Sequence, residues 1–517
     1  MRPISFFMAI TMCCLKAPRN RGTLHHLNHN LQKGKMAGAS FLPNHNKFNE
    51  DLMTDTTTAL AAADKGLDQS LSRLFDFLRI PSISTDQAYQ ASCEKAAHWL
   101  AVELTALGFD ASVRKTPGKP MVVAHYTPKT ATAKTPHALF YGHYDVQPVD
   151  PLDLWHSPPF EPVRKKDADG VERLYGRGAA DDKGQLMTFV EAARAWISAT
   201  GSLPIKATFL IEGEEESGSP SLIPFLKENR AELSCAAAFV CDSNMWDEKT
   251  PAITTRLRGM VREEITITGP RVDLHSGLYG GAAMNPIRVL TKILAALHDK
   301  TGKVAIPGFY DGVKLLPAQT KKQWLSLKFS EKKFMSDVGL SVPAGEKGKS
   351  VLEQIWARPT AEVNGIWGGY TGAGAKTVLP SKANAKLTFR LVGQQKPEKI
   401  LKAVQKFIKD RIPKDCKVAF SGTGGGDPAS EISEDNIFIR KSSAALKAEF
   451  GRAAVLMGSG GSIPIVRNFK DILGMDSVLV GFGLNDDAIH SPNEKYNLAS
   501  FQRGIRSWVR IMGALAE

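Results

Sequence analysis

Three consecutive glutamates follow an apolar stretch of the chain and form its densest group of carboxylates. The segment reads KATFLIEGEEESGSP, and Glu214, Glu215 and Glu216 are followed directly by a Ser-Gly turn. Adjacent carboxylates repel one another and raise each other's pKa, and burial enlarges both effects. A solvated acidic turn is the simplest interpretation of such a run. The alternative is a cation site, in which one carboxylate binds the ion while its neighbour handles a proton.

Two further motifs place acids or a histidine where an apolar or glycine-rich stretch ends. In GHYDVQP, His143 and Asp145 are two residues apart, so a strand would direct both side chains to one side. An aspartate in that position can orient a metal-binding histidine, although a surface histidine is the simpler alternative. In LYGRGAADDKGQ, Asp181 and Asp182 precede a helical pattern, where helix capping is common. A phosphate loop is excluded because the pattern GxxxxGK[ST] is absent.

Two more candidates follow apolar stretches near the middle and the end of the chain. Asp242 ends AAAFVCDS, and His490 lies in the loop after SVLVGFG. Each is weak alone, but a parallel sheet gathers residues that follow the carboxyl ends of its strands. Two imidazoles with several carboxylates suit Zn²⁺, Mn²⁺ or Co²⁺ better than the oxygen-only sites of Mg²⁺ or Ca²⁺. The joint pattern therefore predicts a metal site.

The elements that must position these residues alternate between strands and helices. Residues 66–108 show helical spacing of apolar residues, as does GQLMTFVEAARAWI, which lies between two apolar stretches. The predicted strands are MVVAHY, HALFYGHYDV, KATFLIEGEEES and AAAFVCDS. This alternation predicts an α/β sheet that is covered by helices on both faces.

The pattern of apolar and polar residues changes near residue 260 and changes back near residue 430. VREEITITG and KANAKLTFRLV alternate apolar and polar residues, whereas NPIRVLTKILAALHD and PEKILKAVQKFIKDRI have helical spacing. We expect a strand-helix-strand-strand-helix-strand unit with one open sheet face. The predicted organisation is a catalytic α/β domain over 53–259 and 426–517, into which a smaller α+β domain over 260–425 is inserted.

Composition excludes several classes of protein. The 517 residues carry a formal charge of +13, but the first 52 contain seven Lys or Arg and only two acids. The remaining basic residues form no stripe or motif, so we expect neither nucleic-acid nor membrane binding. The six cysteines form no CxxC pair, which favours a reducing compartment and a cytoplasmic location.

The first 52 residues lack periodicity and are expected to be a disordered extension. Met36 and Met53 are alternative starts to Met1. The first apolar stretch resembles a signal peptide only faintly, since it lacks an A-x-A-like cleavage site. Secretion is therefore the less favoured alternative.

Taken in order, the motifs GHYDVQP, LYGRGAADDKGQ, IEGEEESGSP, FVCDS and HSPNEKY resemble those of the M20 family of di-metal peptidases. The match is closest to its cytosolic dipeptidase and carnosinase branch and runs from about residue 66 to the C-terminus. The resemblance implies two divalent ions per subunit, with Zn²⁺ preferred and Mn²⁺ or Co²⁺ as alternatives. It also implies a catalytic α/β domain with an inserted lid and dimerisation domain.

The resemblance further implies a role for each residue that matches a family motif. His143 and Asp242 would bind one ion, Glu216 and His490 the other, and Asp181 would bridge both and be joined to Asp182 by a cis peptide. Asp145 would orient His143. Glu215 would be the general base for a metal-bridged water, while Glu214 has no family role and is expected to face solvent.

In the smaller domain, the resemblance implies substrate-binding residues. His275 would reach the active site of the other subunit of a homodimer, and Thr377, Arg390 and Ser462 would hold the substrate's terminal carboxylate. The predicted function is metal-dependent hydrolysis of dipeptides and short peptides that have a free C-terminal carboxylate. The alternatives are an N-acyl amino acid deacylase with the same centre, and a non-catalytic metal-binding relative that the presence of Glu215 disfavours.

Overall fold

The computed structural model describes residues 45–422, 426–461 and 463–517, with side chains from Leu52 onward. Helix α1 (His45–Lys65) begins before residue 52, so the predicted border of the extension lies inside a helix. Its periodicity is hard to read because only two leucines, Leu52 and Leu60, join small alanines at its described buried positions. Residues 1–44 lie outside the described part. Among the helices described, none is long and apolar enough to cross a bilayer.

Nine strands form the larger sheet within the described residues, in the order β1-β2-β6-β3-β7-β18-β8-β16, with β17 paired to β8. They are β1 (Asp110–Arg114), β2 (Met121–Tyr126), β3 (His137–His143), β6 (Lys206–Glu212), β7 (Ala237–Val240), β8 (Ala252–Leu257), β16 (Ser430–Glu431), β17 (Val455–Ser459) and β18 (Asp476–Leu479). The central strands β6, β3, β7 and β18 are mutually parallel. They are almost wholly buried, as parallel strands covered on both faces must be.

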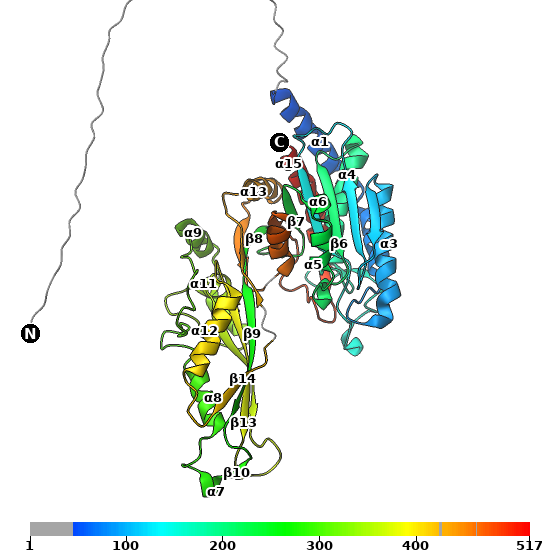
Figure 1. The fold of residues 1–517 in the computed structure, drawn as a ribbon. Helices are drawn as coiled ribbons and strands as arrows, with labels where there is room; N and C mark the ends of the chain where they lie inside the picture. The colour runs from blue at the N-terminus through cyan, green and yellow to red at the C-terminus, as the bar shows by residue number, and fades with distance from the viewer. Residues whose placement is uncertain (1–44, 423–425, 462) are drawn as a thin grey trace, which may run out of the picture. The chain divides into compact units, whose positions relative to one another are not determined.

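Helices cover both faces of this sheet, as the alternation of patterns predicts. One apolar core packs side chains of the sheet against α1, α2, α3, α4, α13 and α15, and a second packs the opposite face against α5, α6 and α14. These helices are α2 (Leu67–Leu78), α3 (Gln90–Ala106), α4 (Lys183–Thr200), α5 (Leu222–Glu228), α6 (Arg230–Leu233), α13 (Ile437–Phe450), α14 (Pro464–Asn468) and α15 (Leu498–Ala516). The mixed α/β class is confirmed (Figure 1).

A smaller antiparallel sheet of five described strands has the order β11-β13-β9-β14, with β15 also paired to β9. Its elements are β9 (Gly259–Thr268), α8 (Pro286–Ala295), β11 (Thr360–Gly368), β13 (Lys382–Leu391), α12 (Pro397–Lys409), β14 (Lys417–Phe420) and β15 (Gly426–Asp427). Alternate residues of β9 and β13 are buried beneath α8 and α12 (Figure 1). The other face of the sheet carries the polar residues, as the strand pattern predicts.

The remaining elements lie outside these two sheets. A separate antiparallel pair of strands, β10 (Leu274–His275) and β12 (Val378–Leu379), lies next to α7 (Ser276–Tyr279). Three short helices, α9 (Ala318–Ser326), α10 (Glu331–Ser336) and α11 (Val351–Trp356), follow α8 in the chain. Near the C-terminus, β19 (Lys495–Asn497) joins β5 (Glu172–Tyr175) and β4 (Val163–Lys166) in a third sheet.

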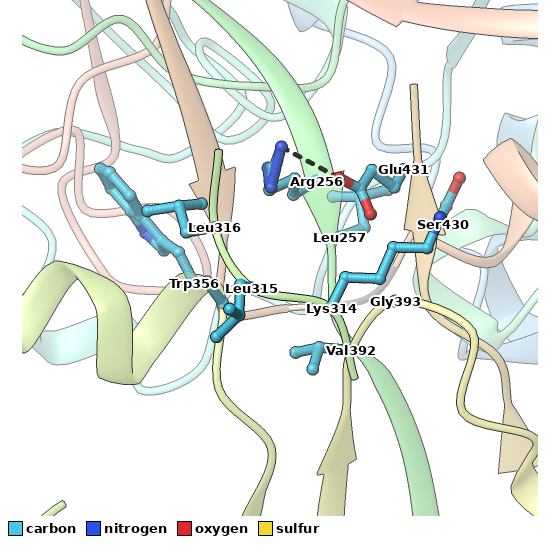
Figure 2. Close-up of a pocket in the computed structure, with 11 residues that line it drawn as sticks. Arg256, Leu257, Lys314, Leu315, Leu316, Trp356, Val392, Gly393, Ser430 and Glu431 are labelled. Carbon is cyan, nitrogen blue, oxygen red and sulfur yellow. Dashed lines mark ion pairs between the residues drawn. The ribbon is translucent and has the colours of Figure 1, made fainter. Parts of the chain in front are cut away.

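The chain passes between the two main sheets at Arg258 and again at residues 428–429. A pocket at this junction is lined by residues of β8 and β16 together with Trp356, Val392 and the segment 314–316. Figure 2 shows that Arg256 and Glu431 form an ion pair there, with 2.9 Å between Nη2 and Oε1. The carboxylate of Glu431 in this pocket is thus already paired, and none of the predicted site residues lines it. We propose that the two sheets are the cores of the two predicted domains.

Candidate metal centre

The four parallel strands at the centre of the larger sheet bring the candidate ligands to one edge. His143 is the last residue of β3, and Asp242 follows β7 by two residues. The glutamate run follows β6, where it begins the short 3-10 helix η3 (Glu215–Ser217). The loop after β18 carries His490. Residues far apart in the chain therefore meet because the carboxyl ends of parallel strands share an edge.

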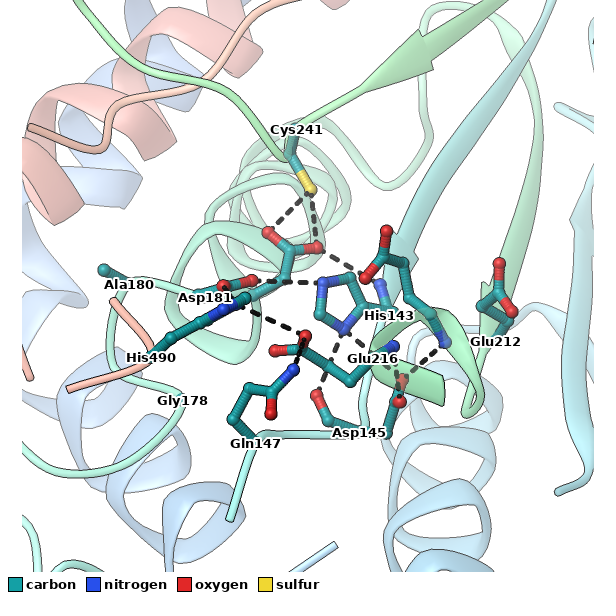
Figure 3. Close-up of polar contacts among 12 residues, drawn as sticks. His143, Asp145, Gln147, Gly178, Ala180, Asp181, Glu212, Glu216, Cys241 and His490 are labelled. Atoms are coloured by element: carbon teal, nitrogen blue, oxygen red, sulfur yellow. Dashed lines mark hydrogen bonds and ion pairs between the residues drawn. The ribbon is translucent and has the colours of Figure 1, made fainter. Parts of the chain in front are cut away.

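Five side chains at this edge form two groups that share one aspartate. His143, Asp181 and Asp242 offer ligand atoms that all lie within 4.8 Å of one another. Asp181, Glu216 and His490 do the same. Figure 3 shows Asp181 between the two imidazoles. Nitrogen and carboxylate donors in two triads around a common carboxylate fit two divalent cations of the zinc or manganese type.

His143 has the geometry expected of a metal ligand. Its side chain is fully buried, and Nδ1 lies 3.1 Å from the carbonyl oxygen of Asp145, which can only accept a hydrogen bond. That contact places the proton on Nδ1 and leaves the lone pair on Nε2. Nε2 is buried and has no hydrogen-bond partner among the described residues, although Asp181 Oδ1 is 3.2 Å away. A cation would satisfy this nitrogen.

The carboxylate of Asp145 makes contacts beyond the one predicted for it with His143. Its two oxygens accept hydrogen bonds from the backbone N–H groups of Glu215 and Glu216, at 3.2 and 3.0 Å. Oδ1 is 3.4 Å from Nδ1 of His143. Asp145 therefore joins the end of β3 to the turn that carries two of the three glutamates, and its backbone carbonyl makes the closer contact with the imidazole (Figure 3).

Glu494, which the sequence patterns did not single out, shapes the loop that carries Asp181. Its buried carboxylate accepts hydrogen bonds from the backbone N–H groups of Gly178, Ala180 and Asp181 at 2.9 to 3.0 Å. It also pairs with Arg177, whose Nη1 is 2.7 Å from Oε2. Because Glu494 lies four residues after His490, one carboxylate ties together the loops that carry two candidate ligands. The peptide between Asp181 and Asp182 is cis.

His490 and Glu216 complete the second triad at the solvent-facing side of the centre. The Nε2 atom of His490 lies 2.9 Å from Asp181 Oδ2 and 3.3 Å from Glu216 Oε2. Gln147, from the GHYDVQP motif, donates a hydrogen bond of 2.6 Å to Glu216. The side chain of His490 is 52% exposed whereas that of Glu216 is 4% exposed, so this triad has a route to solvent.

The electrostatics of the centre show an excess of negative charge. Burial, together with neighbouring acids, raises the pKa of Glu215 and holds that of Asp242 well above its usual range. Burial also raises the pKa of Asp182 to about 7. Hydrogen bonds to Asp181 and Glu216 raise the pKa of His490 to about 10. Raised pKa values of clustered acids, and of the imidazole beside them, are the response expected of a site that would favour cations.

The first glutamate of the run is buried, so the expectation that Glu214 faces solvent is wrong. Its side chain is 4% exposed and accepts hydrogen bonds from the backbone N–H groups of Lys119 at 3.0 Å and Ser221 at 3.2 Å. A Cβ atom on Gly118 would lie 1.6 Å from Glu214 Oε1, so only glycine leaves room for this carboxylate. The carboxylate of Glu214 thus joins the turn to the backbone of Lys119 and Ser221, while the carboxylate of Asp145 bonds to the backbone of the turn itself.

Replacing Glu214 with glutamine is expected to weaken metal binding about 10- to 100-fold, as loss of an outer partner of a metal ligand does. The glutamine amide has one oxygen that can still accept a hydrogen bond. Its NH2 group would face the backbone N–H of Ser221, and because two donors cannot bond to each other, the turn that carries Glu216 would loosen. Titration of the metal-free protein with Zn²⁺ measures the effect.

Glu353→Gln is the matched control for this variant. Glu353 is equally buried and also accepts a backbone hydrogen bond, from Ser350 at the start of α11. Both variants should lose comparable stability, about 1–3 kcal/mol for a buried group left unsatisfied. If Zn²⁺ affinity fell equally in both variants, or in neither, Glu214 would have no positioning role.

The predicted substrate-binding residues are not among the side chains gathered at this centre. His275 and Thr377 lie at the β10–β12 pair, where both are exposed and the N–H of Ser276 bonds to the carbonyl of Thr377. Arg390 lies on β13 opposite Met260. Ser462 falls outside the described residues. The contacts of the described residues join none of the first three to the metal ligands, and their roles stay predictions.

Comparison with known proteins identifies the family. The model of peptidase family M20/M25/M40 matches residues 139–514 of this chain. The chain belongs to the M20 peptidase family. The matched residues include all five side chains of the two triads, together with Asp145 and Glu215, so the candidate centre lies wholly within the family domain of this M20 peptidase.

Relatives of this peptidase include named dipeptidases. It is 30% identical over 473 residues to a Cys-Gly metallodipeptidase of Schizosaccharomyces pombe, covering 88% of this chain and 97% of that one. It is 30% identical over 383 residues to human Beta-Ala-His dipeptidase, covering 73% and 74%. The solved structure of a dipeptidase from Saccharomyces cerevisiae has 28% identity and a TM-score of 0.69, covering 89% of this chain and 98% of that one.

Proposed function

We propose that this M20 peptidase hydrolyses the peptide bond of dipeptides and short peptides with a free C-terminal carboxylate, using two divalent ions. The observation that carries the proposal is the pair of triads that share Asp181, with Glu215 next to them in sequence. Relatives named as Cys-Gly and Beta-Ala-His dipeptidases, each about 30% identical, support the substrate class.

The donor set supports a role for each ligand. His143 and Asp242 would hold one ion, Glu216 and His490 the other, and Asp181 would contribute to both. When bound, such ions polarise a carbonyl and lower the pKa of water toward neutrality. The mixture of imidazole and carboxylate favours Zn²⁺, with Mn²⁺ or Co²⁺ as alternatives.

Glu215 is proposed as the general base. Its backbone is fixed by Asp145, and its raised pKa, caused first by burial, brings the carboxylate closer to the range in which it exchanges protons near neutral pH. It would take the proton of the attacking water and deliver it to the leaving amine. Asp145 would act through the positions of His143 and Glu215.

At the other end of the substrate, Arg390, Thr377 and Ser462 are proposed to bind the terminal carboxylate, for which a guanidinium fork is well suited. We propose a homodimer in which His275 of the partner subunit completes the site, since His275 is exposed on its own chain. A cytoplasmic location is supported by the four described cysteines, which are all free.

The test is hydrolysis of a dipeptide panel and the matched N-acetyl amino acids by chelator-treated protein, before and after Zn²⁺ or Mn²⁺ is restored. We expect metal-dependent cleavage of dipeptides and little release of acetate. Cleavage of the acetylated series alone would identify a deacylase with the same centre. Binding of two ions without turnover of either series would contradict an enzymatic function.

A further inference from the structure

Three arginines on the open face of the five-stranded sheet lack a carboxylate partner. Arg258, Arg262 and Arg390 form no ion pair within the described part of the chain. Arg258 and Arg390 are partly buried whereas Arg262 is exposed. A guanidinium that is partly withdrawn from water without a counter-ion loses hydration that nothing in the chain replaces. Such an arrangement favours binding of an anion.

The strand register places two of the three side chains next to each other. Arg390 on β13 lies opposite Met260 on β9, so Arg262 occupies a diagonal position on the same face. Arg258 directly precedes β9 and lies near enough to Arg390 for the two charges to interact. Burial first, and the charge of Arg390 second, lower the pKa of Arg258 to about 10. Glu362, which lies opposite Thr388 on the neighbouring strand, is exposed; its charge acts on Arg258, but it forms no ion pair with the three arginines among the described residues.

Arg258 is also held against the loop that leads to Ser462. Its Nε donates a hydrogen bond of 3.1 Å to the carbonyl of Gly460, and its backbone N–H donates one of 3.1 Å to Gly461. A Cβ atom on Gly460 would lie 3.0 Å from Nη2, so the guanidinium packs directly on this glycine. The Nε bond fixes its plane, and the terminal nitrogens have no acceptor among the described residues.

Arg258 therefore contacts Gly460 and Gly461 and lies near Arg390, which is proposed to bind the terminal carboxylate. We propose that Arg258 is a specificity-determining residue that binds a second carboxylate on the substrate. The substrate class is then a dipeptide whose C-terminal residue is Asp or Glu. This inference rests on the proposed function, and it adds a preference that the shared metal centre does not supply.

The test compares kcat/KM for Ala-Glu and Ala-Gln, in which the C-terminal side chain ends in a charged carboxylate or in a neutral amide of the same size. The wild type should prefer Ala-Glu. Arg258→Gln should lower kcat/KM for Ala-Glu about 10- to 100-fold, as for a lost charge-assisted hydrogen bond, and change Ala-Gln less than about threefold. Arg258→Lys keeps the charge and should keep part of the preference, while Arg288→Gln, at an exposed arginine of α8 outside the cluster, should behave like the wild type.

An equal loss for both dipeptides in Arg258→Gln would mean that Arg258 binds the common terminal carboxylate, and no loss would mean that it binds neither; both results overturn the inference. Calorimetric titration with glutarate, with butyrate as the one-carboxylate control, measures binding without catalysis. It therefore tests Arg258 even if the proposed hydrolysis is not observed. The wild type should bind glutarate at least about tenfold more tightly, and Arg258→Gln should lose that difference even if no dipeptide is cleaved. Equal binding of both acids by the wild type would also overturn the inference.

Discussion

Substitution of Glu215 by glutamine is expected to lower kcat for dipeptide hydrolysis by roughly 10²- to 10⁴-fold, the usual contribution of a general base. Glutamine keeps the size of the side chain but cannot accept a proton from water. The backbone N–H of residue 215 still bonds to Asp145, so the turn should keep its shape. Steady-state rates at saturating Zn²⁺ or Mn²⁺, measured beside the bound-metal content, test this expectation.

The adjacent glutamates provide the controls for this experiment. Glu216→Gln should reduce metal content as well as rate, because Glu216 belongs to the second triad. Glu214→Gln should weaken metal binding and recover much of its rate at high metal concentration, because its carboxylate contacts only backbone N–H groups of neighbouring loops. If Glu215→Gln lost its ions and regained full activity when metal was added, Glu215 would be a ligand or a support and not the base.

The placement of four of the five candidate ligands could be predicted from the sequence because they lie at or after the end of a strongly apolar stretch. Runs such as KATFLIE and HALFYGH are too apolar for a half-exposed strand, and buried parallel strands share one carboxyl edge. That reasoning alone brings His143, the run of glutamates, Asp242 and His490 together, and the choice of Glu216 within the run required the family motif. Asp181 required the family motif, because an aspartate before a helix is ordinarily only a cap.

What could not be predicted are contacts between loops that no periodic pattern records. The burial of Glu214 depends on the backbone of residues 118–119, about a hundred positions earlier in the chain. The role of Glu494 depends on three backbone N–H groups of the loop before α4. A glycine at position 118 beside a lysine gives no sign of either contact. From the sequence alone, carboxylates that bond to loop backbones in this way cannot be distinguished from solvent-exposed acids.

Because Asp181 belongs to both triads, its substitution is the second change for which a large effect is expected. Asp181→Asn should weaken binding of both ions, because asparagine offers one neutral oxygen where the carboxylate offers two charged ones. We expect a loss larger than the 10- to 100-fold typical of outer partners, with loss of activity at any practical metal concentration. His490→Asn and Asp242→Asn each remove a ligand from only one triad, so each should leave one site of nearly normal affinity.

Competition with a chromophoric zinc chelator distinguishes these outcomes, because it counts the ions and ranks their affinities in one titration. The wild type should withhold two ions from the chelator, the single-triad variants one, and Asp181→Asn none. Retention of one tightly held ion by Asp181→Asn would mean that the aspartate serves a single site, and Glu216 or Asp242 would then have to bridge instead. Loss of both ions in His490→Asn would mean that the two sites fill cooperatively, since His490 is remote from the triad of His143 except through Asp181.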